Sequence, residues 1–507
     1  MYLVLLRHGQ AEDATDFITD ENRKLTEAGI RALRATLPTT FGLLPAQGKI
    51  TVWTSPLVRA RQTADIALAA IEDTCGKKRL THREPLCSDS LADIEIEDAL
   101  VELGNYFKRC TASFSEPGDG ADLSDDRASK LAQLEDETLV LVGHNPQMGL
   151  LAKHLSDNNV HFKKGALACL YFDSDAVLRI MDASADDEMA ASLDSSGQVR
   201  WFVQGPMYKR WKTLIELEDI LKRGFDKVRK EFSRFIDSPE DPDAVHDLRV
   251  AIRTLRSLVS FVGPYQKEKQ NRKMQEMLRS IVRKLSQLRE YDVLIEKAAD
   301  VDIDLGSPVG ELVPPEKLNE QLDRRREKEQ GEVLRTLSRR GTEQLKDLDK
   351  EFSHITWRSD IEKRGLSLDE LNLHFDDMAT DFFASYHALD LSDADRTHKV
   401  RKRAKQVRYV ASKMKPLLGD KAETVTEMKA IQDQLGELCD ARVNTRMLGG
   451  LVQEGDKLSD VARWQAGKLL VKEQGNEQRI LDELAEKRDT AEDGGADAPG
   501  EEGTPGE

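Results

Sequence analysis

The segment Tyr2-Leu-Val-Leu-Leu-Arg7-His8-Gly9 decides the fold of the N-terminal part of the chain. It is a short apolar run that ends in an arginine, a histidine and a glycine, which is typical of a buried strand reaching the edge of an α/β sheet. Ligand sites of such sheets lie at the carboxyl ends of the strands. Arg7 and His8 are therefore predicted to lie at a binding site, one as a forked donor for oxyanions and the other as a nucleophile.

Two later segments place the same residue types at the ends of predicted strands. Ser55-Pro-Leu-Val-Arg59-Ala-Arg61-Gln-Thr63 follows an apolar run and opens a predicted helix, and Val142-Gly143-His144-Asn-Pro146 ends another apolar run. An arginine in the first turn of a helix lies where anions are favoured. Two arginines and two histidines at one sheet edge can hold a phosphoryl group and stabilise its transition state, with His8 as the attacking imidazole.

The rest of residues 1–205 alternates between strand-like and helix-like patterns. Short apolar runs separated by amphipathic stretches predict a mostly parallel sheet with helices on both faces, in three layers. The segment Asp182–Gly197 is rich in Asp, Ser, Ala and Gly and is predicted to be a loop. The predicted strands are residues 3–6, 50–53, 138–142, 168–172 and 199–204, and the predicted helices are residues 26–37, 59–72 and 148–155.

From Trp211 onward the apolar residues recur with the period of an α-helix, so residues 210–485 are predicted to form an all-α domain. The main interruption is the Gly- and Pro-containing segment 306–316. Residues 486–507 are mostly Asp, Glu, Gly, Pro and Ala, and they are predicted to form a disordered acidic tail.

The helical part contains an internal repeat. His246-x-x-Arg249-x-x-x-Arg253-x-x-Arg256 recurs 152 residues later as His398-x-x-Arg401-x-x-x-Lys405-x-x-Arg408. Leu285-x-x-Leu288 recurs 150 residues later as Leu435-x-x-Leu438. The spacing places each set of four basic side chains on one face of a helix.

These stripes carry unbalanced positive charge. Between Arg396 and Lys415 there are nine Lys or Arg residues and no Asp or Glu. Like charges at helical spacing repel, and a bound polyanion would offset that cost. Two related bundles, at about residues 210–300 and 370–485, would bring both stripes to one groove. An ordinary solvated face is the alternative, and a metal site is disfavoured because cations surround both histidines.

Composition limits the kinds of partner and the cellular location that the sequence allows. The net charge of −17 and the scarcity of aromatic residues on the stripes argue against nucleic acid as the partner. No apolar run reaches the roughly 18 to 20 residues that a membrane span needs, and the N-terminus lacks the features of a signal peptide. Five scattered cysteines without a CxxC spacing predict a reducing compartment and no zinc site. We expect a cytoplasmic protein without a cofactor.

Taken in order, the N-terminal motifs resemble the histidine phosphatase superfamily, and within it the small SixA-type phosphohistidine phosphatases. Besides the segments quoted above, Arg23-Lys-Leu-Thr26-x-x-Gly29 matches. The resemblance spans residues 1–205 and implies that His8 is the nucleophile and that Arg7, Arg59 and His144 complete a phosphate pocket. The proton donor stays open, with Glu84, Asp89 and Asp93 as candidates. A folded but inactive phosphatase-like domain is the alternative.

The paired basic helices resemble the CHAD family, named for conserved histidines on α-helices. This resemblance covers about residues 210–485 and implies two pseudo-symmetric bundles around a basic channel that binds inorganic polyphosphate. The second copy has Cys439 and Arg442 where the first has Arg289 and Asp292, so a helix-pairing contact there is predicted to be lopsided. The implied contacts are His246, Arg249, Arg253, Arg256, Arg283, Lys284, Arg289, His398, Arg401, Lys402, Lys405 and Arg408.

Together the two resemblances predict a phosphatase with a phosphohistidine intermediate, coupled to inorganic polyphosphate binding and associated with polyphosphate granules. Its substrate would be a phosphohistidine-bearing protein or a related phosphorylated compound. Two alternatives stay open. One is a polyphosphate-binding protein whose phosphatase-like domain is inactive, and the other is an enzyme that trims polyphosphate.

Overall fold

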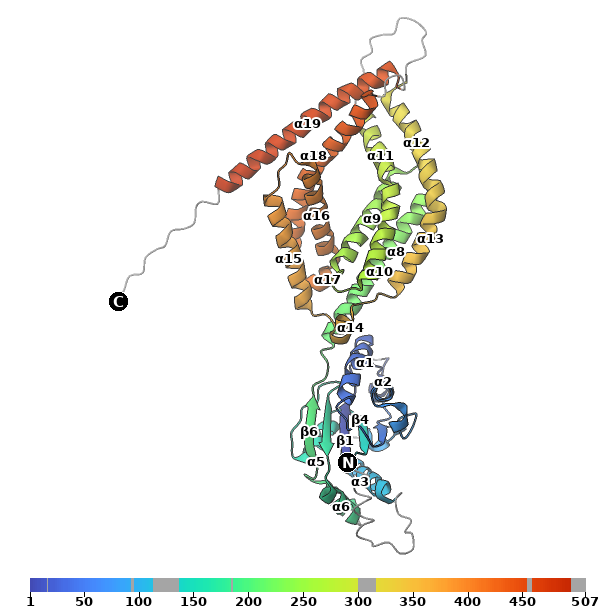
Figure 1. Ribbon diagram of the computed structural model, residues 1–507, viewed down its shortest axis with the longest axis vertical. Helices are drawn as coiled ribbons and strands as arrows, with labels where there is room; N and C mark the ends of the chain where they lie inside the picture. Colours follow the sequence, from blue (N-terminus) through green and yellow to red (C-terminus); the bar gives the residue numbers. More distant parts are fainter. Residues whose placement is uncertain are drawn as a thin grey trace, which may run out of the picture. The chain divides into compact units, whose positions relative to one another are not determined.

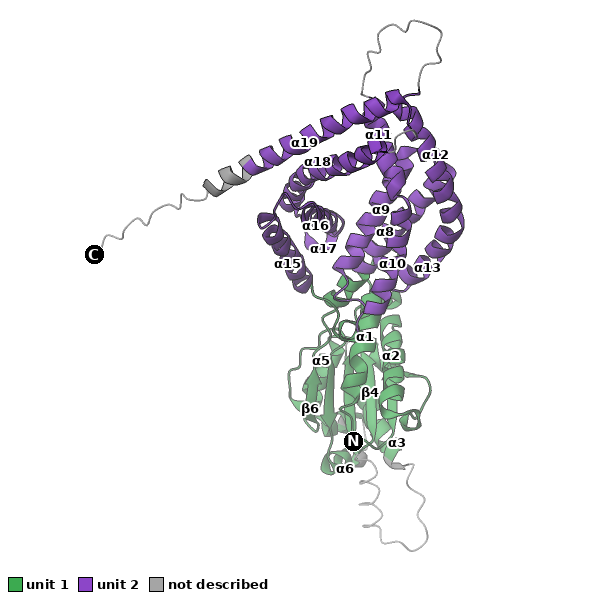
Figure 2. Cartoon of the chain, turned by 45° about the horizontal axis from the view of Figure 1, so that its top comes forward, with its two compact units in different colours: residues 1–215, 359–367 green, residues 216–358, 368–507 purple. Residues whose placement is uncertain are grey.

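The computed structural model describes residues 1–15, 17–92, 95–112, 136–183, 186–299, 316–453 and 458–493. Two compact units share these residues (Figure 2). Unit 1 comprises Met1–Ile215 and Ser359–Ser367, and unit 2 comprises Glu216–Arg358 and Leu368–Glu507. The predicted helix interruption up to residue 315, the candidate acid Asp93 and the tail beyond residue 493 lie outside the described residues.

A six-stranded sheet of order β3-β2-β4-β1-β5-β6 forms the centre of unit 1 (Figure 1). The pairs β1/β4, β2/β4 and β2/β3 are parallel, whereas β5 is antiparallel to both β1 and β6. The sheet is therefore mostly parallel, as predicted. Its strands are β1 (Tyr2–Arg7), β2 (Ile50–Thr54), β3 (Leu86–Cys87), β4 (Thr138–Gly143), β5 (Leu167–Tyr171) and β6 (Gln198–Val203).

Helices cover both faces of the sheet. Alternate residues of β1 enter different hydrophobic clusters: Leu3 and Leu5 pack in one, and Val4 and Leu6 in the other. The first cluster includes residues of α3, α5, α6 and α7, and the second includes residues of α1 and α2. This is the predicted three-layer fold. The helices are α1 (Glu27–Phe41), α2 (Val58–Cys75), α3 (Glu97–Ala112), α5 (Gln147–Ser156), α6 (Ser174–Asp182), α7 (Asp186–Leu193) and α14 (Ser359–Arg364), with short 3-10 turns at Asp20–Asn22, Lys77–Arg79 and Asp89–Leu91.

The segment Asp182–Gly197 is not the loop that its composition predicts, because α7 lies within it. Met189 and Leu193 of α7 are buried in the first cluster. Met189 packs so closely on Gly104 that a Cβ there would lie 2.1 Å from its sulfur. Burial of these two apolar side chains in the core stabilises a helix within a segment that is otherwise polar.

Unit 2 is helical, as predicted. α19 continues to Asp493, beyond residue 485, where the sequence predicts the helical domain to end. Among the described residues, no helix is both long and apolar enough to cross a membrane. The helices are α8 (Lys209–Asp237, which begins in unit 1), α9 (Pro242–Phe261), α10 (Glu268–Lys284), α11 (Ser286–Ala299), α12 (Leu318–Thr336, followed by a π-helical turn at Leu337–Gly341), α13 (Thr342–Ser353), α15 (Leu368–His387), α16 (Ala394–Lys413), α17 (Lys415–Leu418), α18 (Ala422–Gln453) and α19 (Asp460–Asp493).

The two copies of the repeat differ in the signs of the charges that pair two successive helices. In the first copy Asp292 of α11 accepts a 2.5 Å hydrogen bond from Nε of Arg326 on α12. In the second copy Arg442 of α18 donates from Nε to Glu477 of α19 at 2.8 Å. The partners are 34 residues apart in one copy and 35 in the other. The contact that the sequence predicts to be lopsided is therefore made in both copies, with the charges reversed.

Candidate functional site

His8 lies directly after β1 and is fixed by neighbouring backbone. Its N–H donates to the carbonyl oxygen of Gly143 at 2.9 Å, and the residue is 5% exposed. The ring Nδ1 lies 2.7 Å from the carbonyl oxygen of Gly9, which can only accept, so Nδ1 carries the proton. The lone pair of the neutral ring is consequently on Nε2.

Arg59, the second residue of α2, contacts that lone pair. Its Nε donates to Nε2 of His8 at 3.2 Å. Nη2 pairs with Oδ2 of Asp20 at 2.8 Å, and Nη1 donates to the backbone oxygen of the same residue. Thr63, one turn further along α2, accepts from the N–H of Gly9 at 3.1 Å and donates to the carbonyl of Arg59 at 2.7 Å. The Ser55–Thr63 motif therefore ties α2 to the turn that holds His8.

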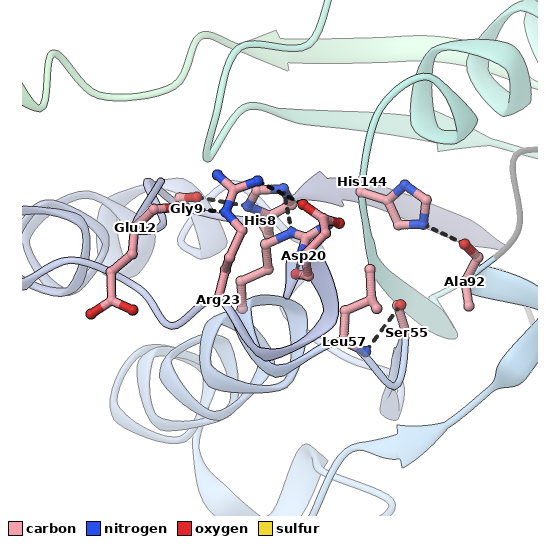
Figure 3. Close-up of polar contacts among 10 residues, drawn as sticks. His8, Gly9, Glu12, Asp20, Arg23, Ser55, Leu57, Ala92 and His144 are labelled. Atoms are coloured by element: carbon pink, nitrogen blue, oxygen red, sulfur yellow. Dashed lines mark hydrogen bonds and ion pairs between the residues drawn. The ribbon is translucent and has the colours of Figure 1, made fainter. Parts of the chain in front are cut away.

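Arg7 and His144 complete the group. Nη1 of Arg7 donates to the carbonyl of Phe162 at 2.7 Å, while its buried Nε has no hydrogen-bond partner among the described residues. His144 follows β4, is buried, and its Nε2 lies 2.9 Å from the carbonyl oxygen of Ala92 (Figure 3). Arg7, Arg59 and His144 each act electrostatically on His8. The structure thus brings the four predicted pocket residues together.

The surroundings keep the imidazole of His8 neutral. Burial, followed by the positive charges of Arg59 and Arg7, lowers the pKa of His8 to about 3, against the opposing hydrogen bond to Gly9. A buried neutral histidine with its free lone pair on Nε2 is in the protonation state that nucleophilic attack requires. The buried Nε–H of Arg7 without an acceptor destabilises the folded protein by about 1–3 kcal/mol, unless an anion accepts a hydrogen bond from it.

Three charged residues that we did not assign to the site from the sequence also lie here. Asp20, in the 3-10 turn Asp20–Asn22, pairs through Oδ1 with Nη1 of Arg23 at 2.7 Å, so its carboxylate links Arg23 to Arg59 (Figure 3). Lys164 has its pKa lowered by burial, then by Arg23 and by Arg7. The next residue, Gly165, donates to the carbonyl oxygens of Arg7 and His8 at 3.0 and 2.9 Å, which places this turn against the backbone of these two residues.

The candidate proton donors have different surroundings. Asp89 is exposed in the 3-10 turn Asp89–Leu91, close in the chain to Ala92, which contacts His144. Glu84 is exposed and acts on Asp65 of α2, whose pKa it helps to raise after burial. Neither has a described hydrogen bond to His8.

In unit 2, six of the predicted polyanion contacts line one pocket, which we call the basic pocket. It has a volume of about 350 Å³ and lies between α9, α10 and α16. None of the described residues that line it is acidic. The six are Arg253, Arg256, His398, Arg401, Lys402 and Lys405, and the other lining residues are Ser257, Ser260, Asn271, Gln275, Gln406 and Tyr409.

Positive charge is crowded in the basic pocket. Burial, then neighbouring cations including Arg401, lowers the pKa of Lys405 to about 8. The pKa values of Lys402 and His398 are also lowered, again by burial first and by the surrounding cations next. Arg401 has a counterion in Asp440 at 3.1 Å. The pocket holds more positive charge than the protein neutralises, which favours an anionic ligand.

The other predicted contacts lie outside the basic pocket. Arg249 donates from Nη1 to Oγ of Ser286 at 3.1 Å, and burial followed by the charge of Arg253 lowers its pKa to about 10. The pKa of His246 is lowered by burial and then by Arg289. These three predicted contacts therefore form a neighbouring group rather than part of the same wall.

Arg283 and Lys284 line a separate pocket of about 600 Å³ on α10, together with Arg279. Arg408 lines a further pocket with residues of α8. Six of the twelve predicted contacts thus line the basic pocket, three line two further pockets, and His246, Arg249 and Arg289 lie outside these three. Within the described ranges, no group of three or more His, Cys, Asp or Glu side chains is arranged to hold a metal ion.

Comparison with known proteins separates the same two regions. Residues 3–165 match the model of the histidine phosphatase superfamily (branch 1), and residues 219–449 match that of the CHAD domain. The comparison with curated proteins found no match.

Solved structures match each region in turn. The protein histidine phosphatase SixA complexed with tungstate is 18% identical over 40% of this chain and 97% of its own, with a TM-score of 0.26. A SixA structure from Nakamurella multipartitia is 22% identical over 40% and 95%, with a TM-score of 0.25. The CHAD domain of the plant Ricinus communis is 18% identical over 53% and 85%, with a TM-score of 0.40.

Proposed function

Because the chain joins a histidine phosphatase superfamily domain to a CHAD domain, we propose that unit 1 hydrolyses a phosphorylated substrate through phosphorylated His8 and that unit 2 binds inorganic polyphosphate. One observation carries the first half of the proposal. The Nε2 lone pair of a buried neutral imidazole is accompanied by two guanidinium groups and a second histidine. These are the parts that phosphoryl transfer to nitrogen needs.

In the first step Nε2 of His8 attacks phosphorus, a bond between nitrogen and phosphorus forms, and the bond to the leaving group breaks. Arg59 gives up its contact with Nε2 and, with Arg7, donates to the phosphoryl oxygens. Phosphorylation makes the ring cationic, and the Nδ1–H bond to the carbonyl oxygen of Gly9 stabilises that charge. The leaving group departs with a proton from an acid or from water.

In the second step water attacks phosphorus from the side opposite His8. The nitrogen–phosphorus bond breaks, its electron pair returns to Nε2, and phosphate leaves with the oxygen of the water. The cationic ring makes nitrogen a good leaving group, and the ring stays cationic because Nδ1 keeps the proton that it donates to Gly9. The Nε2–H of His144 donates to the carbonyl oxygen of Ala92, so this residue would donate to a phosphoryl oxygen through Nδ1 in its doubly protonated form.

The substrate that we propose first is a phosphohistidine-bearing protein. Its phosphorus–nitrogen bond is cleaved without strong acid assistance, which suits a site in which Asp89 and Glu84 have no described hydrogen bond to His8. Inorganic polyphosphate is a second candidate, favoured by one observation. Arg23 and Lys164 add two cations to Arg7 and Arg59, and the carboxylate of Asp20 offsets only one of these four charges, which favours a substrate with several phosphates.

Turnover by His8→Ala tests the proposal, with His82→Ala as the control because His82 is an exposed histidine of the same unit. We expect His8→Ala to abolish phosphate release from a phosphohistidine carrier and from polyphosphate, while His82→Ala retains it. Acid-labile labelling of the wild type, absent in His8→Ala, should identify the intermediate. Turnover by the folded His8→Ala protein would refute the mechanism.

Substitution of Lys164 by methionine separates the two substrates. If polyphosphate is the substrate, kcat/KM for polyphosphate should fall about tenfold or more, as expected for the loss of one charge-assisted contact. With phosphohistidine as the substrate, its turnover should change much less than that. Equal losses on both substrates would mean that Lys164 serves the transferred phosphoryl group itself.

The second half of the proposal rests on the basic pocket. A chain of phosphates can pair with several of its cations at once, and its binding should weaken steeply with added salt. We expect Arg253→Glu combined with Lys402→Glu to abolish polyphosphate binding, and Lys399→Glu, an exposed cation of the same helix outside the pocket, to have a small effect. Binding that is insensitive to salt would refute this half.

A further inference from the structure

The pocket that contains Arg408 adjoins the basic pocket and shares Tyr409 with it. It has a volume of about 560 Å³ and is bounded by α8, α9, α16 and α18. We call it the Arg408 pocket. The residues that line it are Ile220, Arg223, Gly224, Lys227, Asp247, Val250, Ala251, Thr254, Leu255, Leu258, Arg408, Tyr409, Ser412, Lys413 and Val425.

The internal repeat relates the two pockets. Arg256 and Ser260 line the basic pocket, and the residues 152 positions later, Arg408 and Ser412, line the Arg408 pocket. The relation also holds in the opposite direction. Lys402 and Gln406 line the basic pocket, and the residues 152 positions earlier are Val250 and Thr254 of the Arg408 pocket.

A helix next to α9 and a helix next to α16 supply one more pair of related positions. Gln275 of α10 lines the basic pocket, and the offset of 150 residues that holds further along the repeat leads to Val425 of α18, which lines the Arg408 pocket. Equivalent positions on two pairs of helices therefore build both pockets. The duplication that produced two basic stripes also produced two related sites.

The two sites have diverged in polarity. Lys402 and Gln275 of the basic pocket are replaced at the equivalent positions by Val250 and Val425. Ile220, Leu255 and Leu258 extend this apolar wall. Phosphate units pressed against such a wall would lose their hydration without gaining a partner, so an entirely polar chain is a poor occupant.

The Arg408 pocket is nevertheless cationic. Lys227 is paired with Glu231 at 2.6 Å, and Asp247 pairs at 2.7 Å with Arg234, which also pairs with Asp241 and so neutralises Asp247 only in part. In the part of the chain that the structure describes, its other three cations have no acidic partner. They are Arg223, Arg408 and Lys413.

The buried Nε of Arg408 has no hydrogen-bond partner among the described residues. It is a donor that an anion at this position would satisfy. Thr254 and Ser412, which carry hydroxyl groups, are also among the lining residues. The pocket thus combines an apolar wall with a small number of polar groups, which is the usual composition of small-molecule sites.

We propose that the Arg408 pocket binds a small organic anion: one phosphate, sulfonate or carboxylate group attached to an apolar body. The anionic group would lie against Arg408 and Arg223, and the apolar body against Val250 and the leucines of α9. This inference rests on the geometry of unit 2 and is independent of polyphosphate binding by the basic pocket and of catalysis by unit 1.

Titration of the full chain with 8-anilinonaphthalene-1-sulfonate tests the proposal, since this probe joins a sulfonate to an aromatic body and fluoresces when bound. The matched pair of variants is Arg408→Gln and Arg256→Gln, because the repeat makes these two arginines equivalent. We expect Arg408→Gln to weaken probe binding by about tenfold or more and Arg256→Gln to change it by less than about twofold.

Arg223→Gln provides a second variant at an exposed position, in case Arg408→Gln unfolds the helices. It should weaken the probe several-fold at unchanged thermal stability. Tripolyphosphate, which has no apolar part, should displace the probe only at much higher concentration than adenosine monophosphate does. Equal probe affinity in the wild type and both pocket variants, or displacement by tripolyphosphate at the lower concentration, would overturn the proposal.

Discussion

The crowding of charge in the basic pocket makes polyphosphate binding depend on pH in a direction that the structure fixes. Burial lowers the pKa of Lys405 first, and the charges of Arg401 and Arg408 on its own helix and of Arg253 on α9 lower it further, with Asp440 of α18 opposing. Its pKa of about 8 means that it is charged at pH 7 and largely neutral at pH 9. A bound polyanion would reverse the repulsion and restore the proton.

The size of the effect follows from that pKa. The charged fraction of Lys405 in the free protein falls from about nine-tenths at pH 7 to about one-tenth at pH 9. If the bound form keeps the proton, affinity should fall about tenfold over this range, which corresponds to about 1.4 kcal/mol. Lys402, whose pKa is also lowered, adds to the loss in the same direction.

Calorimetric titration with polyphosphate of fixed length at pH 7 and pH 9 would measure this effect. Buffers of different ionisation enthalpy should reveal proton uptake on binding at pH 9. Lys405→Arg keeps the charge at both values and should reduce the pH dependence, whereas Lys399→Arg, at an exposed position outside the pocket, should leave it unchanged. A flat affinity between pH 7 and pH 9, or an unaltered decline in Lys405→Arg, would refute the reasoning.

Three other results are expected. The pKa of His8 is lower in the folded protein than in the unfolded chain, so below pH 6.5 the unfolded chain binds one more proton. This group should therefore lower the free energy of unfolding by up to about 1.4 kcal/mol per pH unit as the pH falls towards 3. Urea unfolding at pH 7 and pH 5 should show a smaller loss of this free energy for His8→Gln than for the wild type. Asp20→Asn frees Arg59 and Arg23 from an internal anion, so inorganic phosphate should inhibit several-fold more strongly in steady-state assays. Arg326→Met leaves Asp292 buried and unpaired, which should cost about 3–5 kcal/mol in urea unfolding, and the exchange of both charges should recover most of it.

The sheet and the four pocket residues could be predicted because their signals are local. A short apolar run ending in Arg7-His8-Gly9 marks both the strand and the edge at which it ends. Arg59 in the first turn of α2 follows from the motif that opens the helix. Because parallel strands end at one edge, residues far apart in sequence had to converge there.

Features that depend on long-range contacts could not be predicted. Lys164 reaches the site because Gly165 bonds to the backbone of Arg7 and His8, a contact across more than 150 residues that no local pattern records. Helical spacing gave the face on which Arg408 lies, but not the helices that flank that face. Since α16 contributes residues to two pockets, one stripe supplies both.

The two copies of the repeat show which positions the fold constrains. Asp292 pairs with Arg326 in the first copy, and Arg442, 150 positions after Asp292, pairs with Glu477 in the second, so both copies have an ion pair between successive helices, with the charges reversed. In the pockets, by contrast, Lys402 corresponds to Val250 and Gln275 to Val425. Both differences make the Arg408 pocket less polar than the basic pocket. Packing between helices holds the frame of each copy fixed, whereas the pocket linings of the two copies differ in polarity.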